Sequence, residues 1–213
     1  MKKTDSLAKR YLFKLLTSFL VIPLNLFLVS ILTKELGPEI YGDFKYIIYS
    51  FTLFVSVISF GGSYFNTELS KNHYNKKLIS FYYNFSFFYW ILSGIFLFLI
   101  IYFGLLNTIL NSNISISLIC FGFFYSMLLF ISSNLESVTD SCGLSKNASI
   151  FNFLSKFFGL LFLLILFYWF NFINVYSVFF YYFFVFVIAS LSFLLLLNNY
   201  KIPIFKFSIS IKD

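Results

Sequence analysis

Six long apolar stretches constrain this chain more than any other feature of its sequence. They cover 12–32, 44–65, 81–103, 114–135, 150–170 and 175–197. A bilayer core about 30 Å thick needs about 20 apolar residues in an α-helix, and each stretch reaches that length. Strands of a membrane barrel would instead alternate in polarity, which these stretches do not. The sequence therefore predicts an all-α integral membrane protein with six transmembrane helices, forming a single domain over 1–213 whose last segment, 198–213, is expected to be a cytoplasmic tail.

The composition excludes a soluble fold. Hydrophobic residues make up 60% of the chain and charged residues only 11%, whereas soluble domains average about 45–50% apolar and about 25% charged residues. Phenylalanine alone contributes 35 of the 213 residues. Most of the outer surface must therefore face lipid, which makes the bilayer the first expected partner.

The basic residues predict the orientation. Of 15 Lys and Arg residues, all but Lys34 and Lys45 fall in the N-terminal arm, the second link, the fourth link with the start of the fifth stretch, or the tail. Six spans would place all these segments on one side of the membrane. Cytoplasmic segments carry the excess of Lys and Arg, so we expect both termini in the cytoplasm. The net charge of +7 follows from this topology, and we expect no nucleic-acid partner.

Polar residues recur on single helical faces inside the apolar stretches. Steps of three and four residues place such residues on one side of a 3.6-residue helix. These small polar residues either pack helix against helix or line a polar cavity. The faces comprise Lys14, Ser18 and Asn25 in the first stretch, Lys45, Tyr49, Thr52, Ser56, Ser59 and Ser63 in the second, and Asn152, Lys156 and Gly159 in the fifth.

Three lysines are the candidate cavity residues that carry charge. Lys156 lies about two turns inside its stretch, where an unpaired charge is costly, which favours a cavity position over snorkelling. Lys14 and Lys45 lie nearer the ends of their stretches, so snorkelling to the interface is favoured for them. The acidic residues Glu68, Glu136 and Asp140 are expected in the cytoplasmic links or at their edges, as ordinary solvated charges.

Catalytic and metal-binding motifs are absent from the sequence. The chain has one histidine, His73, and two cysteines with no CxxC spacing. It contains no HExxH, no GxSxG and no P-loop. We therefore expect a protein that is not an enzyme, with no catalytic residue, no metal and no cofactor.

The first link contains devices that stop one helix and start the next. Gly37 permits a positive φ, Pro38 suits the first turn of a helix, and Glu39 favours the positive N-terminus of that helix. Gly42 is expected to allow close packing or a bend after Tyr41.

The same link resembles that of the polysaccharide flippase family, the O-antigen (Wzx-type) transporters of the multidrug/oligosaccharidyl-lipid/polysaccharide exporter superfamily. The family's link typically reads L-G-P-E-x-Y-G-x-[FY]. Gly61 and Gly62 near the end of the second stretch, and Gly143 with Lys146 in the fourth link, also resemble the family. The residues that match the link motif are Leu36, Gly37, Pro38, Glu39, Tyr41, Gly42 and Phe44.

The resemblance implies a fold, a substrate and a location. The chain looks like the N-terminal lobe of a two-lobed transporter in the bacterial inner membrane. Such a transporter flips oligosaccharide linked to undecaprenyl pyrophosphate, for O-antigen (lipopolysaccharide) or capsular polysaccharide biosynthesis. The second lobe would be a separate polypeptide, a missing part of this one, or a second copy in a homodimer. The alternative is a non-transporting membrane subunit or a truncated remnant of such a transporter.

The resemblance and the polar faces together imply a substrate cavity. Lysines would attract the pyrophosphate, and Asn and Ser side chains would hydrogen-bond the sugars. The candidate cavity residues are Lys156, Lys14, Lys45, Asn25, Asn152, Ser56 and Ser59.

Overall fold

The computed structural model describes residues 7–59, 62–71, 76–102 and 115–200, and nearly all of them are helical. These ranges contain no β-strand. Contacts between apolar side chains on the surfaces of the helices therefore hold the fold together. The elements are α1 (Leu7–Leu36), α2 (Pro38–Ile58), α3 (Gly62–Lys71), α4 (Lys76–Tyr102), α6 (Ile116–Ser141), α7 (Ser145–Leu164), the π-helical segment η1 (Ile165–Trp169) and α8 (Val175–Asn199).

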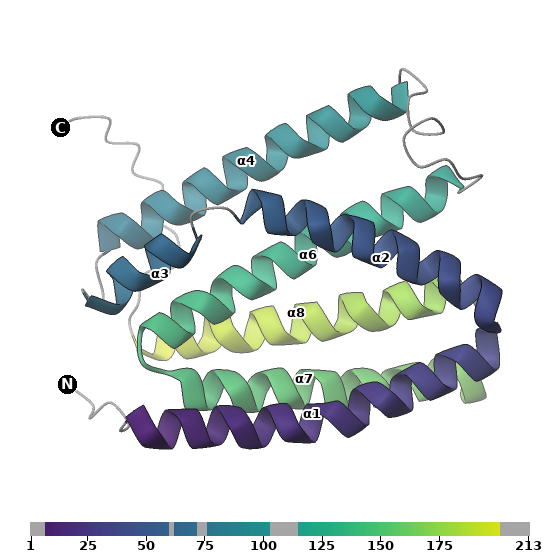
Figure 1. Ribbon diagram of the computed structural model, residues 1–213, viewed down its shortest axis with the longest axis horizontal. Coiled ribbons are helices and arrows are strands. Elements are labelled where there is room, and N and C mark those ends of the chain that lie inside the picture. The colour runs from purple at the N-terminus through teal and green to yellow at the C-terminus, as the bar shows by residue number, and fades with distance from the viewer. Residues whose placement is uncertain (1–6, 60–61, 72–75, 103–114, 201–213) are drawn as a thin grey trace.

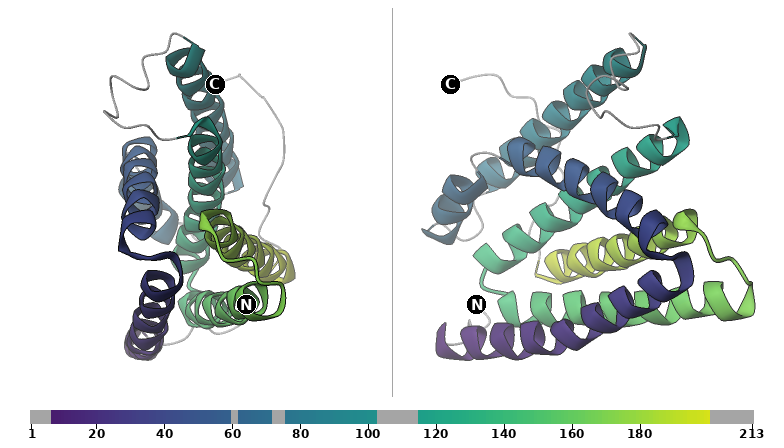
Figure 2. Two further views of the ribbon diagram at one scale, coloured as in Figure 1. Left: turned by 90° about the vertical axis from the view of Figure 1, so that its right-hand side faces the viewer. Right: turned by 45° about the vertical axis from the view of Figure 1, so that its right-hand side comes forward.

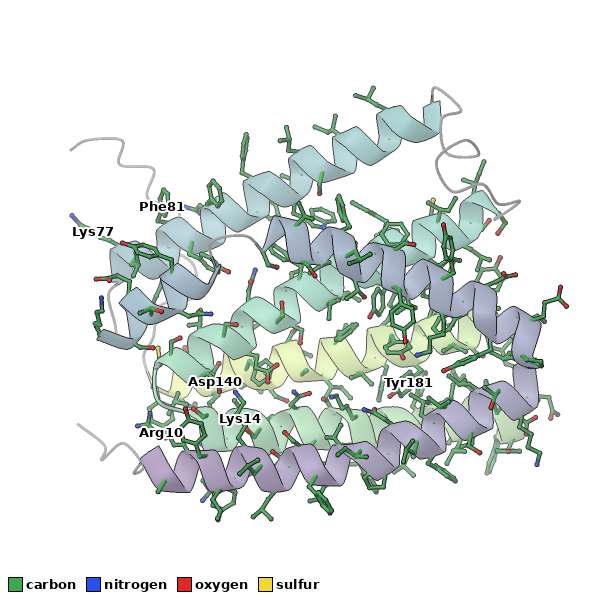
Figure 3. All side chains as sticks on the ribbon, in the orientation of Figure 1. Arg10, Lys14, Lys77, Phe81, Asp140 and Tyr181 are labelled. Atoms are coloured by element: carbon green, nitrogen blue, oxygen red, sulfur yellow. The ribbon has the colours of Figure 1, made fainter. Side chains whose placement is uncertain are left out.

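Helices α1, α6, α7 and α8 run between the same two ends of the molecule, whereas α2 begins at one of these ends and stops near the middle (Figure 1). At one end lie the starts of α1, α4 and α7 and the ends of α6 and α8, with Arg10, Lys14 and Asp140 (Figure 3). We call it the charged end. At the opposite end lie the junction of α1 with α2 and the starts of α6 and α8. We call it the link end.

The core forms where α1 and α2 meet the other long helices. In Figure 2, α1 and α2 lie along one side of the molecule, while α6, α7 and α8 lie along the other. Leu32 of α1, Phe44 of α2 and Phe179 of α8 are fully buried between them. The Phe44 and Phe179 rings meet edge to face at 5.2 Å, a favoured aromatic geometry. Burial of large apolar side chains therefore joins both sides at the link end.

Four helices are long and apolar enough to cross a membrane. They are Arg10–Leu36, Ile116–Ser141, Ser145–Trp169 and Val175–Asn199, which coincide with the first, fourth, fifth and sixth predicted stretches. This pattern confirms an all-helical, multi-pass membrane protein. Helices α2 and α4 overlap the other two stretches, and the count of six spans stays a prediction.

The second stretch does not form one continuous helix as expected. Helix α2 ends at Ile58 with Ser59 as its C-cap, and a separate helix, α3, begins at Gly62. The sequence has two adjacent glycines here, Gly61 and Gly62, and glycine disfavours a helix interior by about 1 kcal/mol relative to alanine. The polar face predicted to continue to Ser63 is therefore shorter, because Ser63 belongs to α3.

Several links are shorter than the sequence analysis expected. The segment 136–149 was expected to be a link, but α6 continues to Ser141 and α7 begins at Ser145. Likewise, α1 extends to Leu36, and the expected link at 66–80 is largely the helices α3 and α4. Polar residues at these positions end the apolar stretch, but the helix continues through them. The expected link at 104–113 and nearly all of the tail lie outside the described residues.

The gap of 171–174 between the fifth and sixth predicted stretches is also a short link in the structure. After η1, Asn171 adopts a positive φ of 50°, and Asn174 caps α8. The Asn174 side chain accepts a hydrogen bond from the Ser177 N–H at 3.0 Å. Together with a bond from the Asn174 N–H to the Ser177 side chain, this forms a capping box.

Two glycines allow helices to approach closely. A Cβ atom on Gly122 of α6 would lie 2.8 Å from Ile47 Cγ2 of α2, and a Cβ atom on Gly159 of α7 would overlap Val185 of α8. Small residues at such contacts let membrane helices pack backbone to backbone. Gly159, expected on the polar face of its stretch, therefore has a packing role.

We predict that Gly122→Ala and Gly159→Ala each destabilise the protein, because the added methyl group forces the paired helices apart. Overpacking of this kind costs about 1–3 kcal/mol. Thermal unfolding of the purified protein in detergent measures the loss. Gly42→Ala is the matched control, since a Cβ there would meet no atom within 4 Å. Equal melting temperatures for all three variants would contradict the packing.

Candidate functional site

A salt bridge joins α1 to the end of α6 at the charged end. The Lys14 Nζ atom lies 2.8 Å from Asp140 Oδ2, and the two side chains are 55% and 25% exposed. Figure 3 shows both residues beside Arg10, where the start of α1 passes the end of α6. The second carboxylate oxygen, Oδ1 of Asp140, is buried and accepts no hydrogen bond within the described part of the chain. Lys14, a predicted cavity residue, is thus paired with a carboxylate.

A second polar contact joins α6 to α7 at the same end. The Asn152 Nδ2 group donates a hydrogen bond of 3.1 Å to Glu136 Oε1. Lys156 follows Asn152 by one turn of α7, and Glu136 interacts electrostatically with Lys156 and Lys14. Three helices therefore meet in one polar group, which we call the charged cluster: Lys14, Glu136, Asp140, Asn152 and Lys156.

The expectation that the acidic residues are loop charges was wrong, because all three lie on helices. Glu136 and Asp140 occupy the last turns of α6, and Glu68 lies on α3 beside Lys71, at 3.3 Å. Glu136 is half-buried, and the Asn152 amide with the Lys14 and Lys156 ammonium groups offsets part of the cost of burying its charge. A signal was present in the sequence: Glu136 with Asp140, and Asn152 with Lys156, both have the four-residue spacing of one helical face.

The turn between α6 and α7 supports the charged cluster. Gly143 has a φ of +82°, which an L side chain rarely adopts. A Cβ atom on Gly143 would lie 3.1 Å from an Arg10 guanidinium nitrogen. Lys146, at the start of α7, places its Nζ 4.5 Å from the centre of the Phe13 ring, a cation–π contact. The start of α1 is therefore in contact with this turn at several points.

Lys45 lies in a separate group nearer the link end. Its Nζ is 5.4 Å from the Tyr41 ring centre and 5.6 Å from that of Tyr49. Tyr41 lies one turn of α2 before Lys45, and Tyr49 lies one turn after it. The ammonium group therefore makes cation–π contacts with both rings. The structure does not bring Lys45 together with Lys14 and Lys156, which lie in the charged cluster.

The remaining predicted cavity residues lie on α1 and α2. Asn25 is exposed in α1, near the middle of a candidate membrane helix. Ser56 donates to the Thr52 carbonyl at 2.9 Å, and Ser59 donates to the Val55 carbonyl at 2.8 Å. Serine hydroxyls that bond their own helix need no partner from elsewhere. Among Asn25, Ser56 and Ser59, it is therefore Asn25 that needs a polar group or water beside it when its helix spans the membrane.

The first link adopts the predicted stop and restart. Gly37 has a φ of 80°, Pro38 is the first residue of α2, and Glu39 lies in its first turn. The Tyr41 N–H donates to the Gly37 carbonyl at 3.1 Å. Leu36, the last residue of α1, is buried. The expectation for Gly42 was wrong, because α2 runs straight through it and no atom approaches its Cα closely enough to exclude a side chain.

Metal-binding groups are not found in the described ranges. No three His, Cys, Asp or Glu side chains there lie close enough together to hold a metal ion. The chemistry available in the charged cluster is that of amino, carboxylate and amide groups. Such groups bind anions, cations or polar ligands through hydrogen bonds and charge.

The fold and the four candidate spans define a multi-pass α-helical membrane protein. No protein-family model, curated protein or solved structure matches the chain significantly. The functional conclusion therefore depends on the residues and contacts described above.

We predict that Gly37→Ala destabilises the protein while Gly42→Ala does not. A non-glycine residue at φ 80° costs about 1–3 kcal/mol where the backbone cannot relax. Alanine at Gly42 instead favours the helix by about 0.5–1 kcal/mol. Chemical or thermal unfolding in detergent checks both changes. A Gly37→Ala protein as stable as the wild type would show that the link tolerates another backbone conformation.

Proposed function

We propose that this chain is one six-span lobe of a flippase for lipid-linked oligosaccharide in the bacterial inner membrane. The exported glycan would serve O-antigen or capsular polysaccharide biosynthesis. The resemblance of the first link to polysaccharide flippases supports the proposal. The link geometry is compatible with it, since Gly37 and Pro38 form the tight helix junction that the motif requires.

The observation that carries the proposal is the set of exposed polar side chains on α1. Lys14, Ser18 and Asn25 are exposed along a helix long and apolar enough to span the membrane. Polar groups within a span are costly in lipid, so they face a bundle interior or a water-filled cavity. The described fold leaves this polar face of α1 uncovered. A transporter lobe needs such a face to line its substrate path.

The two lysine groups suit an anionic substrate at both membrane faces. The charged cluster supplies Lys14 and Lys156 at one end, and Lys45 lies with two tyrosines nearer the other end. A pyrophosphate group would be attracted to ammonium groups at each end, and Asn152 and Asn25 would hydrogen-bond sugars. The positive-inside rule assigns the charged end to the cytoplasm.

The second lobe would cover the polar face of α1 and the adjacent face of α2. Ser56 and Tyr49 are exposed there as well. Either a different polypeptide or a second copy of this chain would fill that role. Alternating access would then follow from rocking of the two lobes about the substrate path.

We predict that deletion of the gene in the source organism abolishes surface polysaccharide and that lipid-linked oligosaccharide accumulates inside. The wild-type gene restores export. Lys156→Gln reduces export about tenfold to about a hundredfold, because a charge-assisted bond to phosphate contributes about 1.5–3 kcal/mol. Immunoblots of surface glycan and extraction of the lipid-linked precursor measure both quantities.

The matched control is Lys77→Gln, an exposed lysine of α4 at the same end and outside the charged cluster. It should export as the wild type does. Unchanged surface glycan after gene deletion would overturn the proposal. Normal export by Lys156→Gln would remove that lysine from the substrate path.

A further inference from the structure

Helices α1 and α7 pack side by side, and both begin at the charged end (Figure 1). An Arg10 guanidinium nitrogen lies 3.1 Å from the position that a Cβ atom on Gly143 would take. Three residues further along each segment, the Lys146 Nζ lies 4.5 Å from the centre of the Phe13 ring. The two contacts share one register. They place a guanidinium and an ammonium group where the two helices begin, which we call the α1–α7 seam.

The two basic groups of the seam are close enough to serve one anion. Arg10 and Phe13 are separated along α1 by a rise of about 4.5 Å, and Lys146 lies over Phe13. Both basic groups carry more N–H donors than a single contact uses. A phosphate group has several acceptor oxygens, and its hydrogen bonds to guanidinium and ammonium groups are strengthened by charge.

The carboxylates near the seam already have basic partners. Asp140 is paired with Lys14 at 2.8 Å, and Glu136 has Lys156 as an electrostatic partner. No carboxylate within the described ranges forms an ion pair with Lys146. The seam therefore keeps positive charge that an anion from outside the protein can compensate.

An apolar stripe continues from Lys146 along the exposed side of α7. Steps of three and four residues place its members on one helical face: Ile150, Phe153, Phe157 and Leu161. Phe157 and Leu161 are 39% and 41% exposed, and the Phe153 and Phe157 rings are stacked with centres 6.4 Å apart. Lys146 and Phe157 are separated by a rise of about 16 Å, about half the thickness of a bilayer core of about 30 Å.

We infer that the α1–α7 seam binds an anionic phospholipid from the leaflet at the charged end. The phosphodiester accepts hydrogen bonds from Arg10 and Lys146, and one acyl chain lies along the apolar stripe of α7. Basic sites between membrane helices on the cytoplasmic side bind acidic lipid headgroups by the same combination of contacts. The inference concerns the bilayer itself as a partner, and it does not depend on the function proposed above.

A lipid fits this seam better than a soluble phosphate does. The basic groups and the apolar stripe follow one another on the same side of α7, as the headgroup and the chain of a lipid do. A soluble phosphate would contact only the basic groups and would leave the stripe unused. The length of the stripe matches a chain that reaches the middle of the bilayer.

Native mass spectrometry of the purified protein in detergent measures the binding of single lipids. Phosphatidylglycerol should bind more tightly than phosphatidylethanolamine with the same acyl chains, and added salt should weaken only the former. Lys146→Gln and Arg10→Gln should each weaken the first phosphatidylglycerol about fivefold, the effect of one basic residue beside an anionic lipid. Lys146→Arg keeps the charge and should bind as the wild type does.

The chain contact is tested by Phe157→Ala, which should weaken phosphatidylglycerol binding about threefold, because part of the apolar contact is lost. Two matched controls lie on α4 at the same end (Figure 3): Lys77→Gln and Phe81→Ala, both exposed in the wild type. They should bind as the wild type does. Phosphatidylglycerol should also raise the melting temperature of the wild type more than that of Lys146→Gln, and melting without lipid checks that each variant folds.

Four outcomes would overturn the inference. Equal binding of the two phospholipids would remove the recognition of charge. An equal loss in Lys77→Gln and Lys146→Gln would replace the seam by a diffuse basic surface. Binding of glycerol 3-phosphate as tight as that of phosphatidylglycerol would make this a site for soluble phosphate. Farnesyl pyrophosphate stands in for the lipid-linked substrate, and tighter binding of it that Lys146→Gln abolishes would assign the seam to that substrate instead.

Discussion

Hydrocarbon offers no hydrogen-bond partner, and this constraint arranges the polar groups of the whole chain. Within the long helices, hydroxyl groups donate to the backbone of their own helix, as Thr52 does to the Ile48 carbonyl and Ser126 to the Phe123 carbonyl. Several charged and amide groups pair at the charged end, where Lys14 meets Asp140 and Asn152 meets Glu136. The distribution of charge along the helices thus follows from their solvent.

Without a hydrophobic driving force between membrane helices, close contact must hold them together. Gly122 and Gly159 provide it by letting a facing side chain lie where a methyl group would be. Aromatic rings fill the wider spaces, as where the Tyr125 and Tyr182 rings meet edge to face at 5.4 Å. The abundant phenylalanine and tyrosine of the sequence therefore serve both the lipid surface and the contacts between helices.

The sequence predicted the elements that depend on local composition. Apolar stretches located the four candidate membrane helices, and the Gly37–Pro38 signal located the junction of α1 with α2. It failed where a helix continues past its apolar stretch, because Glu136 and Asp140 follow the fourth stretch while α6 continues to Ser141. Four-residue spacings mark the polar faces of α6 and α7, but their contact with α1 could not be predicted, since Lys14 and Asp140 are 126 positions apart.

The surface of the first half of α1 follows from the same constraint. Leu15 and Phe19 are exposed, and lipid is a favourable surrounding for such side chains. Its polar groups are different: Lys14 needs a partner, and Asp140 supplies one. Contact between α1 and the end of α6 therefore includes an ion pair, whereas contact with lipid needs only apolar side chains.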